Sequence, residues 1–341
     1  MTIDIRRREF ITLLGGAAAL SSSLRPIAAR AQQADRVRRI GVLAGGAEGD
    51  PYQKAYLVAL REGLAKLGWV EGRNLRIDIR FEASDRNRIR TSAAELVSLA
   101  PELIVVSAGN AVTRALQQQT KTITIVFAEG GDPVVSGMVQ NIARPEGNTT
   151  GFSNTEPSFA GKWLELLKEA APHVTRVALL FNAELSTTAL GPAYISLIEA
   201  AAPALALQTI VLPIRDAVDI VRAIDAFAAE PNGGLLVLPP PPTGANREAI
   251  IRLAAQHRLP AIFNNRDVAA AGGLIAYGND VVDQHRRAAA YVDRLLRGAK
   301  VSELPVQFPT KFELVINLKT AKAIGLAIPE AFLLRADEVI E

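Results

Sequence analysis

The sequence predicts an α/β protein of two lobes, each built on a doubly wound parallel sheet. Short runs rich in Val, Ile and Leu alternate with segments of helical length roughly every 25 residues. These runs are apolar on both faces, as a parallel strand covered by helices on each side requires. About 310 residues follow an N-terminal leader-like segment, enough for two ordinary α/β domains. A hydrophobic content of 49% supports well-buried cores.

The first series of elements lies ahead of residue 145. Pro51 suits the first turn of a helix, and Gly68 suits its left-handed end. We expect strands at 37–43, 75–81, 103–107 and 123–127, with helices at 51–67, 86–99, 111–120 and from Pro133 onward.

A second series begins after Pro145-Glu146-Gly147-Asn148. The strand–helix–strand connections should be right-handed, which gives a second doubly wound lobe. Four consecutive prolines, 239–242, exclude a helix or central strand, so they form a stiff loop that is a candidate rim of a cleft. We expect strands at 176–181, 207–212, 234–238, 261–263 and 274–277, with helices at 159–171, 188–202, 217–229 and 245–257.

The first 31 residues are typical of an export signal. Arg7 and Arg8 precede an apolar run, 10–20, and a small-residue site, Ala29-Arg30-Ala31, follows. The paired arginines followed by Phe10 resemble a twin-arginine signal. An amphipathic helix of the mature protein and a membrane anchor are the alternatives. Roughly 11 to 15 apolar residues fall short of the about 20 that a membrane span needs.

Composition excludes several functions. The chain carries 38 Lys+Arg against 35 Asp+Glu, but without residues 1–31 the two counts are 33 each, so nucleic acid is not the expected partner. Zero cysteines exclude disulfides, a Cys nucleophile and a lipid-bearing cysteine, so we expect a soluble product. The three histidines lie far apart, and we expect no metal and no cofactor.

Enzyme signatures are absent from the sequence. It contains no G-x-G-x-x-G after the first strand, no P-loop pattern and no G-x-S-x-G. We therefore expect a binding protein and no enzyme. An exported hydrolase that uses a carboxylate pair stays open, because separation in space is invisible in a sequence.

Five stretches in order resemble the ABC-transporter substrate-binding family, whose characterised members include proteins that bind tryptophan and other aromatic amino acids. The resemblance covers residues 36–341 and rests on 39–43, 68–75, 131–134, 143–151 and 315–322. Two departures, Glu146 and the pair Glu129-Gly130, bear on the ligand and not on the fold. The resemblance implies the type I periplasmic-binding-protein architecture, in which three crossovers join two Rossmann-like lobes. The lobes would comprise residues 36–150 with 281–305, and 151–280 with 306–341.

The same resemblance implies a function. The chain would be the soluble, monomeric periplasmic component of an ABC importer, capturing a small polar ligand between its lobes and passing it to a membrane permease. An amino acid or a related small carboxylate is the favoured ligand. Hinges are expected near 148–154, 279–282 and 304–308. A ligand sensor for a signalling receptor is the alternative.

Candidate ligand contacts follow the carboxyl ends of the predicted strands, where ligands of open α/β sheets bind. The segment Ser107-Ala108-Gly109-Asn110 leads into a helix, and its N–H groups and hydroxyl suit a carboxylate. The competing interpretation is that Ser107 or Asn110 merely caps that helix. Asp132 before Pro133 is either a ligand contact or, more simply, a helix cap.

Other candidates offer charge or aromatic surface. Asp280 ranks first among carboxylates that could neutralise an ammonium, ahead of Asp50 and Glu48, because Tyr277 precedes it in a tight turn. Arg266, after Asn264 and Asn265, could grip a carboxylate, or could pair with Asp267 or an acid of the other lobe. The last candidates are Phe181 and Asn182, with Phe152 and Ser153 as a similar pair. Their rings could line an aromatic binding site, but buried aromatic side chains more often belong to the hydrophobic core.

Overall fold

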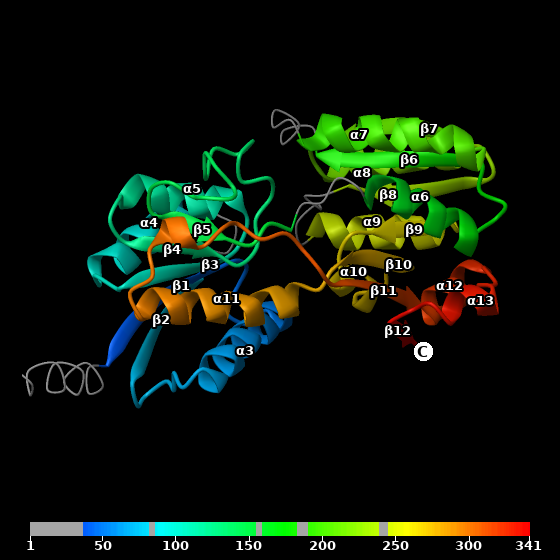
Figure 1. Cartoon of the computed structure of the whole chain (residues 1–341). Helices are drawn as coiled ribbons and strands as arrows, with labels where there is room; N and C mark the ends of the chain where they lie inside the picture. The colour runs from blue at the N-terminus through cyan, green and yellow to red at the C-terminus, as the bar shows by residue number, and fades with distance from the viewer. Residues whose placement is uncertain (1–36, 82–85, 155–158, 183–189, 239–244) are drawn as a thin grey trace, which may run out of the picture.

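A computed structural model describes residues 37–81, 86–154, 159–182, 190–238 and 245–341. It forms two lobes side by side, each with its own sheet (Figure 1). The expected export signal and the proline run 239–242 lie outside these residues. Among the described residues, no helix has the length and apolar character to cross a membrane.

The sheet of the first lobe is parallel throughout and has the order β2-β1-β3-β4-β5. Successive side chains of a strand point to opposite faces. In β3, Leu103 and Val105 join one core cluster, while Ile104 and Val106 join another. The strands are β1 (Arg38–Ala44), β2 (Leu75–Phe81), β3 (Leu103–Ser107), β4 (Thr124–Phe127) and β5 (Thr149–Gly151).

Two helix pairs cover the faces of this sheet. Helices α3 (Pro51–Lys66) and α11 (Val281–Leu296) share one cluster, and α4 (Arg86–Ser98) and α5 (Asn110–Gln119) share the other. Gly63 permits the close approach of α3 to α11, because a Cβ there would lie 2.7 Å from the Ala289 Cβ. A helix that follows the whole second series in sequence thus completes the first lobe (Figure 1).

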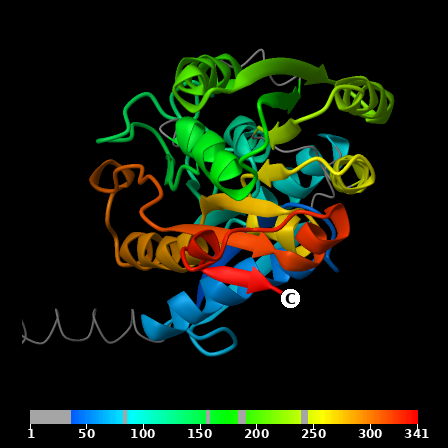
Figure 2. The same ribbon diagram turned by 90° about the vertical axis from the view of Figure 1, so that its right-hand side faces the viewer.

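The second lobe holds a seven-stranded sheet of order β12-β11-β10-β9-β8-β6-β7. All its pairings are parallel except that of β10 with β11. Figure 2 views the molecule from the side of this lobe. The strands are β6 (Arg176–Asn182), β7 (Gln208–Ile214), β8 (Gly233–Val237), β9 (Ala261–Phe263), β10 (Ile275–Asn279), β11 (Phe312–Asn317) and β12 (Glu338–Ile340).

Helices again cover both faces. Residues of α6 and α7 pack in one cluster, and residues of α8 and α9 pack in the other. The helices are α6 (Phe159–Ala170), α7 (Leu190–Ala201), α8 (Ala217–Ala228), α9 (Ala245–Gln256), α10 (Arg266–Ala270), α12 (Leu318–Ile324) and α13 (Glu330–Leu333), with 3-10 turns η2 (Ala202–Leu205) and η3 (Val301–Glu303).

Three chain segments cross between the lobes and bond to one another. One leaves β5, one joins β10 to α11, and one leads from η3 to β11. The Ser153 N–H donates to the Gln307 carbonyl at 2.8 Å, and the Asp280 N–H donates to the Lys311 carbonyl at 3.1 Å. The three crossings therefore form one connected strap (Figure 1).

One sequence prediction about the elements is wrong. Residues 133–137 form turns and no helix, because the Asp132 carboxylate and carbonyl accept the N–H groups of Val134, Val135 and Ser136 and close a compact loop. The second sheet is parallel as predicted, apart from the one antiparallel pairing of β10 with β11. Strand β10 ends, and β11 begins, at the side of the sheet where the crossovers to the first lobe lie. The two strands therefore run in opposite directions.

Candidate functional site

A cavity of about 290 Å³ lies between the lobes. The first lobe contributes Tyr52 and Tyr56 to its walls. The second lobe and the crossovers contribute Asn265, Arg266, Asp267, Asn279, Asp280, Lys311 and Glu313, among others. The cavity lies where the carboxyl ends of the two sheets face each other, the place where open α/β sheets bind ligands.

The start of α3 places two tyrosines against the second lobe. The Asp50 carboxylate accepts the N–H of Tyr52 at 2.8 Å and so caps the helix. Tyr52 and Tyr56 are four residues apart and share a face of α3. Their hydroxyls donate to the carbonyl and to the Oδ2 of Asp267, at 2.9 and 2.8 Å. Asp50, a predicted ligand carboxylate, thus serves the helix start.

Ser107 is fully buried and bonded within the first lobe. The Nδ1 of His285 lies 2.9 Å from the Val281 carbonyl, which can only accept, so Nδ1 carries the proton. The Nε2 then accepts from the Ser107 hydroxyl at 2.7 Å. Burial lowers the pKa of His285 to about 4, so the ring is neutral. The Ser107 hydroxyl, predicted to meet a ligand carboxylate, points into the protein instead, because a histidine 178 residues away holds it.

The start of α5 has no side-chain cap. Gly109 is the N-cap, and the Oδ1 of Asn110 accepts the Gly131 N–H at 2.7 Å. Neither Ser107 nor Asn110 therefore caps this helix, contrary to the capping interpretation. The N–H groups that follow Ala108 are left without a side-chain partner at the positive end of the helix dipole.

Asp132 has a structural role in this fold. Its Oδ1 accepts the N–H groups of Val134 and Val135, each at 2.9 Å. The cap that the sequence indicates is present, but it closes a turn and starts no helix.

Asp280 is paired within the protein. Its Oδ1 accepts the Asp283 N–H at 2.8 Å and caps α11, while its Oδ2 accepts from the Lys311 ammonium at 2.6 Å. Burial alone would raise the pKa of Asp280, but the lysine and the N–H outweigh it and the pKa is lowered. Nearby, burial and the Asp280 charge raise the pKa of Glu313 to about 7.

Arg266 is held by Glu338 of β12. Its Nε and Nη2 each donate to a carboxylate oxygen at 2.8 Å, a bidentate pair. The partner belongs to the same lobe, so the expectation of Asp267 or an acid of the other lobe is wrong. Strand β12 brings Glu338 beside Arg266 from 72 residues away.

The aromatic candidates are core residues: Phe152 belongs to a core cluster of the first lobe, and Phe181 and Tyr277 pack in the second. Phe181 packs against the main cluster of the second lobe, and Tyr277 meets Phe159 edge to face with ring centroids 5.8 Å apart. The Asn182 side chain is outside the described part. The Asn264 Oδ1 is a buried acceptor with no hydrogen-bond partner among the described residues. A Cβ at Gly278 would lie 1.9 Å from the Asn264 carbonyl oxygen, so only glycine lets this loop pass.

Sequence reasoning missed a pair of acids, Glu129 and Asp267. Burial, followed by the Asp267 charge, raises the pKa of half-buried Glu129 to about 7. Burial raises the pKa of Asp267 to about 6, although Tyr56 donates to it. The available signal was the unusual Glu129-Gly130 ahead of Asp132, which the sequence marked as a departure from the family pattern.

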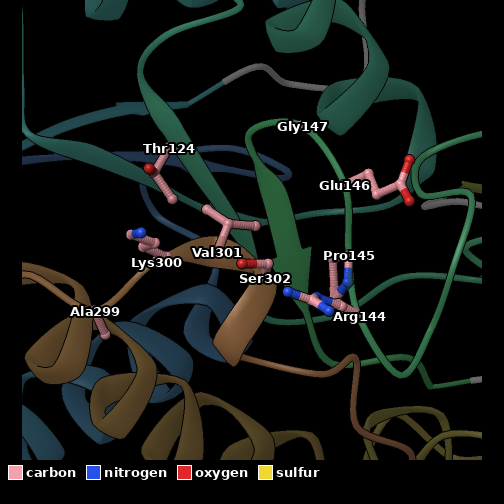
Figure 3. A pocket seen from close by; sticks show the side chains of 9 residues that line it. All are labelled: Thr124, Arg144, Pro145, Glu146, Gly147, Ala299, Lys300, Val301 and Ser302. Carbon is pink, nitrogen blue, oxygen red and sulfur yellow. The ribbon is translucent and has the colours of Figure 1, made fainter.

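A larger hollow of about 590 Å³, shown in Figure 3, lies elsewhere. Thr124, the first residue of β4, lines it together with Arg144, Glu146 and Lys300. It therefore lies at the amino end of the first sheet, away from the second lobe. In the described part of the chain, no three His, Asp or Glu side chains gather in a way that could hold a metal ion.

Comparisons with known proteins agree with this architecture. Residues 47–340 match the model of the family described as ABC transporter substrate binding protein. A tyrosine-binding protein of Clostridioides difficile is 23% identical over 284 residues, 81% of this chain and 77% of that protein. A conserved domain protein from Vibrio cholerae superposes with a TM-score of 0.77 at 27% identity, over 89% of this chain and all of that one. An ABC domain from Streptococcus pneumonia in complex with L-Trp superposes with a TM-score of 0.78 at 22% identity, over 89% of this chain and 99% of that one.

Proposed function

Because the chain belongs to the family of ABC transporter substrate-binding proteins, we propose that it captures an amino acid or a related small carboxylate between its lobes and delivers it to a membrane permease. The observation that carries this proposal is the cavity walled by residues of both lobes. A tyrosine-binding protein and an L-Trp complex among the similar proteins support an amino acid as the ligand.

The ligand carboxylate binds at the start of α5 in this proposal. No side chain caps the N-terminus of α5, whose N-cap is Gly109. A helix N-terminus favours negative charge, so the N–H groups of the segment 108–110 suit a carboxylate. Asn264 of the second lobe has a buried acceptor with no donor, which supports a polar contact from the opposite side.

Ligand capture requires the two lobes to close on each other. The strap formed by residues 151–154, 279–281 and 304–311 overlaps the segments near 148–154, 279–282 and 304–308 where we expect the hinges. A ligand that contacts both lobes stabilises the closed arrangement, and the closed form would be what the permease binds. The lobes that move are residues 36–150 with 281–305, and 151–280 with 306–341.

Purified protein beginning after residue 31 tests this function. We expect L-tyrosine, L-tryptophan or L-leucine to raise the melting temperature, since a ligand that binds only the folded state stabilises it by mass action. Glucose serves as the control and should leave the temperature unchanged. Stabilisation by sugars alone, or turnover of a bound compound, would contradict the proposal.

We also propose that the chain works as a soluble monomer in the periplasm, exported by the twin-arginine route. Replacing both Arg7 and Arg8 by Lys should leave unprocessed chain in the cytoplasm, as measured by cell fractionation. Arg25→Lys is the matched control. Normal export of the double variant would exclude this route but would leave the ligand function standing.

A further inference from the structure

Besides the strap, side chains of α3 in the first lobe bond directly to the start of α10 in the second. The Tyr52 hydroxyl donates to the Asp267 carbonyl at 2.9 Å, and the Tyr56 hydroxyl donates to the Asp267 Oδ2 at 2.8 Å. The partners are 215 and 211 residues apart in sequence, so these bonds exist only while the two lobes are together. Both partners of each bond belong to the chain, so the contact needs no ligand to bridge it.

A cation of the second lobe adds to this contact. The guanidinium carbon of Arg247, in α9, lies 5.8 Å from the centroid of the Tyr52 ring, within the range of a cation–π interaction. Burial raises the pKa of Tyr52 and that of Tyr56, so both hydroxyls keep their protons and remain donors at neutral pH. Each tyrosine is therefore bonded to the second lobe.

The first lobe holds its side of the contact in place. Only 6% of Tyr56 is exposed, and its ring stacks on that of His285 with centroids 4.7 Å apart. The His285 ring in turn accepts from the Ser107 hydroxyl of β3 at 2.7 Å. The hydroxyl of Tyr56 is thus positioned by the core of its own lobe.

The second lobe fixes the acceptor. The Oδ1 of Asn265 accepts the Asp267 N–H at 2.9 Å and caps α10. The Nδ2 of Asn317 donates to the Ala269 carbonyl at 2.9 Å and ties α10 to the end of β11. Because donor and acceptor are held in place before they meet, little side-chain freedom is lost when the hydrogen bonds form.

We propose that Tyr52, Tyr56 and Asp267 form a latch that holds the two lobes together in the absence of a ligand. This inference deepens the proposed function and rests on it for the hinged movement of the lobes. Opening the cleft must break both hydrogen bonds, so the latch sets the ratio of closed to open protein before a ligand arrives. A ligand enters through the open arrangement, so the latch also sets how much of the protein can admit one.

Distances between spin labels on the two lobes test the latch. The chain contains no cysteine, so introduced cysteines are the sites that take the label. Ala94→Cys in α4 and Ala226→Cys in α8 are exposed positions on different lobes. Double electron–electron resonance at pH 8, without added ligand, gives the fractions of closed and open protein. Mass spectrometry of a denatured sample establishes that no amino acid has been carried through purification.

We expect the short distances of the closed arrangement to dominate in the unaltered protein. Tyr52→Phe keeps the ring and removes one neutral hydrogen bond, so the ratio of closed to open protein should fall about fivefold. Tyr56→Phe should lower it at least tenfold, because its acceptor is a carboxylate. Tyr194→Phe is the matched control. This tyrosine packs against Trp163 in the core of the second lobe, and its variant should leave the distances unchanged.

Substitutions of the acceptor test the same bond from the other lobe. Asp267→Ala removes the acceptor of Tyr56 and should open the protein as far as Tyr56→Phe does. Asp267→Asn keeps an oxygen that can accept from Tyr56 and should remain more closed than Asp267→Ala. This pair of variants decides the question even if a tyrosine variant fails to fold.

Failure of the latch and failure of the function are distinguishable. Equal distance distributions for the unaltered protein and the variant that lacks both hydroxyls overturn the latch. Long distances that already dominate in the unaltered protein overturn it too. Neither result bears on ligand capture, which the melting temperatures with amino acids test separately. If no amino acid raises the melting temperature while the tyrosine variants open the protein, the latch stands and the proposed ligand class is wrong.

Discussion

Asp280 and Asp267 line the same cavity, yet the protein treats them in opposite ways. Asp280 has its own ammonium, that of Lys311 at 2.6 Å, and its pKa is lowered. Asp267 has a tyrosine donor and no ion pair with any residue that the structure describes, and its pKa is raised to about 6. Where the chain supplies the counter-charge, the carboxylate fastens the strap between the lobes. Where the described residues supply none, the carboxylate lines the cavity with only a tyrosine hydroxyl bonded to it.

The largest loss of stability is expected at His285, which packs against Tyr56, the hydrogen-bond donor to Asp267. His285→Ala removes a fully buried ring that stacks on Tyr56 and accepts from Ser107. The cavity and the unpaired hydroxyl should lower the free energy of unfolding by about 3 kcal/mol in urea titrations. His173→Ala, at an exposed position, is the control. A loss below that of the control would mean that Tyr56 needs no such support.

Next comes the pH dependence of Asp267→Asn. The folded pKa of about 6 lies above the ordinary value of about 3.9, so this group contributes most to stability below about pH 4, and that contribution is lost as the pH rises through 6. The variant should therefore gain on the order of 2 kcal/mol relative to the unaltered protein at pH 8 and nothing near pH 4. Unfolding curves between pH 4 and pH 8 measure this gain. If the variant and the unaltered protein had the same pH profile, the pKa of Asp267 would not be raised in the folded protein.

Asp280→Ala should have a smaller effect of the opposite sign. It removes the cap of α11 and the ion pair with Lys311, whose side chain is 62% exposed, so we expect a loss of about 1 kcal/mol at pH 7. A lowered folded pKa stabilises above the unfolded value, so this contribution is lost as the pH falls below about 4. Asp280→Asn keeps the cap and should lose less. A gain in stability of Asp280→Ala at pH 7 would show that the pairing with Lys311 does not stabilise the protein.

The smallest effect is expected for Arg266→Ala. Its pair with Glu338 is more than a third exposed on both sides, so we expect a loss of about 0.5 kcal/mol and amino-acid binding within twofold of the unaltered protein. Glu338→Gln should match it. A tenfold loss of affinity would show that Arg266 leaves Glu338 to grip the ligand carboxylate, as the sequence first suggested.

Local patterns predicted the elements well where chemistry and periodicity coincide. Pro51 begins α3, and the apolar runs at 103–107 and 261–263 are β3 and β9. Prediction failed at Pro133, where the Asp132 cap closes a turn, since the same signal fits both outcomes. It also gave no sign that β11 runs antiparallel, because strand direction depends on where a crossover enters the sheet.

The candidate site shows the same limit. Sequence reasoning selected the segments at 107–110, 264–266 and 277–280, all near the facing edges of the two sheets, because strand ends rich in polar residues are visible in the chain. It did not find the partners of Ser107 and Arg266, which lie 178 and 72 residues away. It did not select Tyr56 and Asp267, which are 211 residues apart in sequence and form a hydrogen bond in the folded protein.

The sequence by itself determined the two series of strands and helices and the family, since these follow from periodicity, composition and short motifs. Only the tertiary structure decided which acids received a cation. Lys311 reaches Asp280 through a crossover and Glu338 reaches Arg266 through a neighbouring strand, while Asp267 accepts a hydrogen bond from the Tyr56 hydroxyl. Charge pairing depends on distances in space, and a chain specifies those distances only once it has folded.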